Sequence, residues 1–231
     1  MSFKKRATKS IALALIGVTV AIPTMNTVSA MENSQSYIEV NQNNLETIED
    51  LGINQDFIDG GVFDPSKMNE SEKKAYYEAI EKQVDLMIKE YGENFDAQSF
   101  REELIFVLET ENSLQSLSDA DLLAGSWIPD IKIKNSVAAA AFNTAIDVLL
   151  ISAGVGTVTA LVKKVGVNEA RKMFTRTLTS KLKAWGLVAL AGFIPTCVNF
   201  VFNLLSPGSA IATFLDKNDH FKNNGYIDVV L

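Results

Sequence analysis

The sequence predicts an all-α protein in which an acidic helical N-terminal domain is followed by a C-terminal hydrophobic helical hairpin with a basic amphipathic connector. Two observations carry this prediction. Two long apolar segments, residues 136–162 and 184–206, contain one charged residue and none, respectively. Outside them, apolar residues recur at helical spacing between capping residues. A chain of 231 residues has room for one or two domains with a sizeable core.

The first 30 residues have the pattern of a secretory signal peptide. Four basic residues among the first nine precede an apolar run from Ile11 to Ile22. Val28 and Ala30 are small residues at the two positions that a signal peptidase reads. We therefore expect cleavage at about Ala30 and a mature chain that begins near Met31 in the extracellular medium. The alternative is a retained anchor in the cell membrane, for which the apolar run is short.

Charge divides the remaining chain into two predicted domains, residues 31–130 and 131–231. Residues 31–134 carry 23 acidic and eight basic residues, whereas residues 135–231 carry five acidic and nine basic residues. Nucleic-acid binding is not expected, because the chain is acidic overall and its basic residues lie between membrane-length apolar segments.

The acidic domain contains two strong helix patterns. The first spans residues 70–91, with Asn69 and Glu72 as a capping box and Gly92 as the C-cap. The second spans about 98–111, with a possible cap at Ser99. The other expected elements are a short helix at 45–51, a helix at 118–125, a hinge at 127–130, extended residues at 131–134, a helix at 209–215 and a terminal strand at 226–231.

The first apolar segment is long enough to cross a bilayer, which takes about 20 apolar residues. Its charged residue, Asp147, must face water, a pore or a partner helix if the segment spans a membrane. In a soluble core helix, Asp147 would instead pair with a base or cap a break. Small residues at four-residue spacing, Ser152, Gly156 and Ala160, predict close pairing with another helix, which also allows self-association.

The second apolar segment contains Pro195, which is expected to kink it, and a polar face formed by Asn199 and Asn203. The chain's single cysteine, Cys197, is expected to be a buried and inert thiol.

The connector between the apolar segments has apolar residues at helical spacing beside basic residues, a pattern typical of a helix on an anionic lipid surface. An alternative is that this basic face packs against the acidic domain. The residues expected to contact anionic lipid are Lys163, Lys164, Arg171, Lys172, Arg176, Lys181 and Lys183.

No pattern for catalysis or cofactor binding is found, so the chain is not expected to be an enzyme. Asp216, Asn218 and His220 have the spacing of the first ligands in a calcium loop. The glycine and the closing glutamate of such a loop are missing, and no metal site is predicted.

The signal pattern, the acidic helical region and the apolar hairpin with its basic connector together resemble the layout of secreted bacteriocin-like and toxin-like proteins of Gram-positive bacteria. The resemblance implies insertion into membranes and their permeabilisation. A second hypothesis is a resident two-span membrane protein with a cytoplasmic basic loop and an envelope or immunity role.

Overall fold

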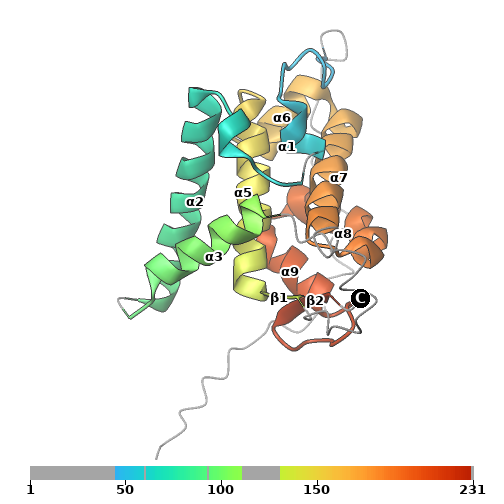
Figure 1. Ribbon diagram of the computed structural model, residues 1–231. Helices are drawn as coiled ribbons and strands as arrows, with labels where there is room; N and C mark the ends of the chain where they lie inside the picture. Colours follow the sequence, from blue (N-terminus) through green and yellow to red (C-terminus); the bar gives the residue numbers. More distant parts are fainter. Residues whose placement is uncertain (1–44, 60, 93, 111–130, 230–231) are drawn as a thin grey trace, which may run out of the picture. The chain divides into compact units, whose positions relative to one another are not determined.

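The computed structural model describes residues 45–59, 61–92, 94–110 and 131–229, which belong to one compact unit of residues 39–231. This unit is mostly helical (Figure 1), which confirms the all-α class. The predicted signal peptide, the helix at 118–125 and the hinge at 127–130 lie outside the described residues.

The elements are α1 (Gln55–Asp59), the 3₁₀ helix η3 (Pro65–Lys67), α2 (Glu70–Tyr91), α3 (Ala97–Glu109), β1 (Ile131–Lys134), α5 (Asn135–Ser152), α6 (Val158–Val165), α7 (Val167–Ala184), the 3₁₀ helix η5 (Val188–Phe193), α8 (Ile194–Asn203), α9 (Gly208–Asp216) and β2 (Tyr226–Val229).

The ends of α2 are confirmed as predicted. The Asn69 side chain accepts a hydrogen bond from the backbone N–H of Glu72, whose carboxylate accepts one from the N–H of Asn69. Gly92 follows the helix with φ = 81°, a conformation that glycine adopts without strain. The buried stripe of α2 passes through Tyr76, Ile80 and Val84.

One predicted helix cap and one predicted helix were wrong. α3 begins at Ala97, because the carboxylate of Asp96 accepts the N–H of Ser99 and so caps the helix before Ser99 could. The expected helix at 45–51 is a series of turns, and the short helix α1 lies further along the chain, at 55–59.

α5 is the central helix of the described unit. It contacts α2 and α3 on one side and α7 and α9 on the other (Figure 1). Every residue from Val137 to Ile146 is buried. The Phe142 ring packs on the Trp185 ring at the end of α7, with 5.0 Å between the ring centroids. α5 therefore supplies most of the core that the other helices cover.

The first apolar segment is not one membrane-length helix over its predicted extent. α5 ends at Ser152, Gly154 turns the chain with φ = 70°, and Thr157 caps α6 by accepting the N–H of Ala160. Within the described residues, α5 alone is long and apolar enough to cross a membrane, and about two thirds of its 18 residues are buried.

The second apolar segment is also interrupted. η5 occupies its first part and the ten-residue α8 its second. Pro195 lies in the first turn of α8, where its missing N–H would have no helical partner, so it starts a helix instead of kinking one. The predicted kink was therefore wrong.

The connector is an amphipathic helix, as predicted. α7 buries the whole apolar stripe that the sequence indicates, namely Ala170, Met173, Phe174, Thr177, Leu178 and Leu182. Its packing partners are α1, α5, α6, α8 and η5. Cys197 in α8 is buried, as expected.

Glycine and a short sheet bring the C-terminal elements onto α5. A Cβ atom on Gly208 would lie 2.0 Å from the carbonyl oxygen of Ala139, so only glycine permits this approach of α9 to α5. β1 and β2 pair in an antiparallel register that places Lys132 opposite Asp228. The Asp216 carboxylate accepts the side-chain N–H of Asn135 and the backbone N–H of Gly225, fixing the loop before β2.

The predicted division into domains near residue 130 is not confirmed. α2 and α3 come from the predicted acidic domain, yet both pack on α5 of the predicted hairpin domain. The helices on the two sides of residue 130 thus share one core.

Candidate functional site

A groove lies beside the polar notch of α5. The notch consists of Asn143 and Asp147, four residues apart on one face of the helix, as predicted. The groove has a volume of about 530 Å³. Its walls come from α2, from α5, from the loop before α6 and from residues 201–207. It combines these polar groups with apolar side chains, among them Leu86, Leu204 and Leu205.

Asn143 links three elements at the floor of the groove. Its side-chain nitrogen donates to Gln83 Oε1 of α2 at 3.1 Å and to Ser206 Oγ at 3.0 Å. Its Oδ1 accepts the backbone N–H of Gly208 at 2.8 Å. Because Asn143 is almost completely buried, these bonds offset the cost of removing its amide from water.

Asp147 pairs with a base, which is the arrangement expected for a soluble core helix. Lys82 Nζ of α2 lies 2.8 Å from Asp147 Oδ2. The Asp147 side chain is 22% exposed and that of Lys82 is 60% exposed, so the pair is open to water. An ion pair of this kind contributes at most about 1 kcal/mol to stability.

The groove offers little for catalysis. Its lining residues include hydroxyl groups at Thr157, Thr159 and Ser206 but neither histidine nor cysteine. Nowhere among the described residues do three histidine, cysteine, aspartate or glutamate side chains gather as they would around a metal ion. The arrangement is suited to binding apolar groups and to holding helices together.

The predicted pairing face of small residues does not form. Ser152 is the last residue of α5, Gly156 lies in the following loop and Ala160 is in α6. Helix pairing by a small residue occurs instead at Gly208, against Ala139. The sequence signal for this position is the glycine directly after Pro207.

The other residues expected to insert or pair lie on the surface. Pro195, Asn199 and Asn203 are exposed on one face of α8. Asn203 donates to the carbonyl oxygen of Asn199 at 2.7 Å, and Asn199 Oδ1 accepts from Arg171 at 3.0 Å. Asn203 lines the groove together with Asp147, whereas Pro195 and Asn199 lie outside it.

Most basic residues of the connector have partners within the protein. Lys164 lies 3.3 Å from Glu46, and Arg176 Nε donates to Asp59 at 2.8 Å. Lys172 pairs with Glu169, and the Arg171 guanidinium lies 4.7 Å from the centroid of the Phe202 ring. Lys163 and Lys183 are exposed. Lys164 of α6 and Arg176 of α7 are thus paired with acidic residues from earlier in the chain, which agrees in part with the alternative left open above.

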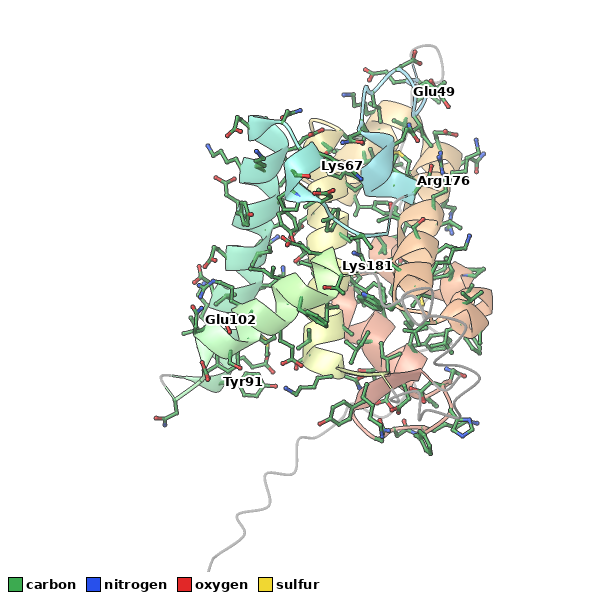
Figure 2. The ribbon with its side chains drawn as sticks, viewed as in Figure 1. Glu49, Lys67, Tyr91, Glu102, Arg176 and Lys181 are labelled. Carbon is green, nitrogen blue, oxygen red and sulfur yellow. The ribbon has the colours of Figure 1, made fainter. Side chains whose placement is uncertain are left out.

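Lys181 differs from the other basic residues because it is buried (labelled in Figure 2). Its ammonium lies 4.5 Å from the centroid of the Phe63 ring and donates to the carbonyl oxygen of Leu108, near the end of α3, at 3.4 Å. Burial lowers the pKa of Lys181 to about 7. The nearby Trp185 Nε1 donates to the carbonyl oxygen of Val107 at 2.9 Å. Lys181 therefore holds α3 to α7 and cannot contact lipid in this structure.

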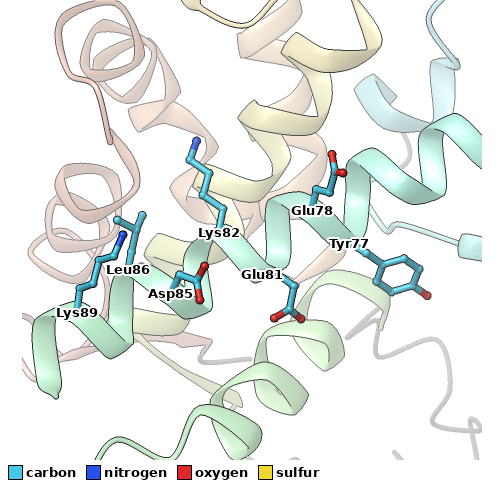
Figure 3. Close-up of a pocket in the computed structure, with 7 residues that line it drawn as sticks. All are labelled: Tyr77, Glu78, Glu81, Lys82, Asp85, Leu86 and Lys89. Atoms are coloured by element: carbon cyan, nitrogen blue, oxygen red, sulfur yellow. The ribbon is translucent and has the colours of Figure 1, made fainter. Parts of the chain in front are cut away.

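The outer face of α2 carries a second, shallower depression. Figure 3 shows Tyr77 and Leu86 among five charged side chains of the same helix. These are Glu78, Glu81, Lys82, Asp85 and Lys89. Glu81 Oε1 accepts a hydrogen bond from Arg101 Nε of α3 at 2.7 Å. This face is therefore a charged surface that is connected to the neighbouring helix.

Comparison with known proteins adds no assignment. No protein-family model, no curated protein and no solved structure matches this chain. The functional proposal therefore depends on the residues described above.

Proposed function

We propose that this chain is a secreted membrane-active protein, bacteriocin-like or toxin-like, which folds in water with its membrane-length helix covered and acts by exposing that helix to lipid. The proposal depends on two properties of α5. It is long and apolar enough to span a bilayer, and it is packed beneath α2, α3, α7 and α9. A helix with these two properties can exist both in a soluble protein and in a membrane.

The contacts that cover the basic connector support a masked form. Glu46 pairs with Lys164 and Asp59 pairs with Arg176, and the four side chains of these pairs are each at least about a third exposed. Exposed ion pairs are weak and are screened by salt. Glu46 and Asp59 therefore neutralise two of the seven basic residues of the connector in solution, and a competing anionic surface can displace them.

The lengths of the two apolar segments favour this proposal over the two-span resident protein. A second span would have to come from η5 and α8, which together cover Val188–Asn203, and this stretch is shorter than a bilayer requires.

Cell fractionation separates the two hypotheses. Mature protein in the culture medium is expected, and protein confined to the membrane fraction would favour the resident form.

The direct test follows α5 itself. An environment-sensitive fluorophore on Ile151→Cys, in a Cys197→Ala background, would report on the exposed end of α5 without disturbing its buried face. With vesicles that contain anionic lipid, we expect release of a trapped dye and a label that is shielded from aqueous quenchers. The same label on Lys89→Cys, on the outer face of α2, serves as the control and is expected to stay accessible to water. Intact vesicles together with an accessible label on α5 would contradict the proposal.

Removal of Glu46 and Asp59 tests whether their ion pairs restrain the protein. The double variant Glu46→Gln/Asp59→Asn is expected to release dye faster than the wild type, by about threefold to tenfold if the two pairs contribute about 1 kcal/mol together. Glu90→Gln, which removes an exposed acid elsewhere on α2, is the matched control. Equal rates for all three proteins would show that these pairs do not restrain the protein.

A further inference from the structure

A second surface of the molecule is free of charge. Residues 184–215 contain no acidic, basic or histidine residue over 32 positions, and they form η5, α8 and the buried helix α9. Part of this stretch faces the solvent. Pro195, Thr196, Asn199 and Asn203 share the exposed face of α8. Val188, at the start of η5, is 58% exposed. We call the exposed part of residues 188–205 the neutral face.

The neutral face ends in an apolar loop. Leu204 and Leu205 connect α8 to α9; Leu205 is fully exposed and Leu204 is 38% exposed. Both line the groove beside α5 together with Phe202. Single exposed leucines are common in soluble proteins, but two adjacent ones at the edge of a charge-free surface mark a site for an apolar partner.

The exposed charged side chain in contact with the neutral face, Arg171, is basic. One carboxylate, Asp147, also lines the groove with Leu204 and Leu205, and it is paired with Lys82. Arg171 lies across the edge of the neutral face, stacked on Phe202 and bonded to Asn199. The exposed residues Lys183 and Lys217 flank the charge-free stretch on its two sides in the sequence. Basic side chains beside exposed apolar side chains complement the phosphate groups and acyl chains of a phospholipid bilayer. The outer face of α2, with its three acids, does not offer this complementarity (Figure 3).

We infer that the protein first docks on phospholipid bilayers through the neutral face, with the Leu204–Leu205 loop entering the acyl region, and that neutral lipid is sufficient for this step. The inference rests on the proposed membrane activity and specifies its first contact. For this first contact, it replaces the expectation that the basic connector recognises anionic lipid. In the structure, Lys164, Lys172 and Arg176 are paired within the protein and Lys181 is buried.

Flotation with vesicles tests the inference. The wild type is expected to bind vesicles of phosphatidylcholine alone, with an affinity that 0.5 M KCl changes less than about threefold, because docking through the neutral face has little electrostatic component. The variant Leu204→Ser/Leu205→Ser should bind at least about tenfold more weakly, since it loses the burial of two leucine side chains. Val167→Ser removes an exposed apolar side chain at the start of α7 and is the matched control, with unchanged binding expected.

The outcomes separate the two proposals. Because Leu205 is fully exposed and Leu204 is only partly covered, the double variant is expected to keep the wild-type circular dichroism, with a melting temperature lowered only by the loss of the covered part of Leu204. Binding that requires phosphatidylglycerol, is lost in high salt and is unaffected by the leucine substitutions would overturn the inference while leaving the membrane activity in place. If the wild type neither binds vesicles of either composition nor releases trapped dye, the proposed function itself fails.

Discussion

α5 and α8 both originate from long apolar segments, but they occupy different environments. α5 has buried residues on all sides of the helix and forms the centre of the unit, whereas α8 buries Ile194, Cys197, Val198 and Val201 and exposes the opposite face. The difference follows from their neighbours. α5 has packing partners on two sides, and α8 packs against α7, α9, η5 and α6 and is left open to solvent elsewhere. Apolar length therefore does not determine burial, and the two segments are expected to respond differently to mutation.

The largest difference is expected for leucine truncation. Leu149→Ala in α5 should destabilise the protein by about 3 kcal/mol, because the side chain is fully buried and its removal leaves a cavity. Leu205→Ala, in the loop after α8, should change stability by less than about 0.5 kcal/mol. Urea unfolding of both variants measures this contrast. Equal losses would mean that the 204–205 loop is also buried in solution.

Glycine substitution is expected to give the next largest contrast. Gly208→Ala would place a methyl group against the Ala139 carbonyl oxygen and the Asn143 side chain, forcing α9 away from α5 at a cost of about 2 kcal/mol. Gly192→Ala in η5 meets no atom within 4 Å and should be close to neutral. Thermal unfolding measures both, and a neutral Gly208→Ala would contradict the close approach of α9 to α5.

The connector offers a contrast between two lysines that are two residues apart. Lys181→Met should stabilise the protein at pH 7 by about 1 kcal/mol or more, because it removes a buried ammonium that has no carboxylate partner among the residues that the structure describes. Lys183→Met, on the exposed side, should have little effect. A loss of stability in Lys181→Met would mean that the contacts to Leu108 and Phe63 outweigh the cost of burying the charge.

The same lysine predicts a pH dependence. The pKa of Lys181 is about 7 in the folded protein and is about 10.4 for an ordinary lysine, as in the unfolded chain. Between these values the unfolded state binds more protons, so wild-type stability should rise from pH 7 to pH 9.5, and the full cost of the buried charge should be present below pH 7. Urea unfolding across this range measures the rise, which Lys181→Met should abolish and Lys183→Met should retain.

The smallest effect is expected for the exposed ion pair of the polar notch. Lys82→Ala should cost less than about 1 kcal/mol, because its ion pair with Asp147 is open to water. Asn143→Ala should cost about 2 kcal/mol, since it leaves the buried N–H of Gly208 without an acceptor. Chemical unfolding of the two variants compares the exposed and the buried halves of the notch, and a larger loss for Lys82→Ala would contradict the assignment.

The local sequence determined the helical class and several element boundaries. The capping box at Asn69 and Glu72, the C-cap at Gly92 and the buried stripe of α7 were all predicted correctly, because each depends on residues within a few positions of one another. The polar notch at Asn143 and Asp147 was also identified from its spacing, although both a membrane and a core interpretation remained open. The residue types fix these features wherever the helices pack.

Only the tertiary structure decided which partners each feature has. Lys82 is 65 positions from Asp147, and Arg176 is 117 positions from Asp59, so neither ion pair can be read from local spacing. The burial of Lys181, the close approach at Gly208 and the pairing of β1 with β2 likewise depend on segments far apart in the chain. Composition makes a segment apolar, but the number of helices that pack around it determines whether it becomes a buried core or an exposed face.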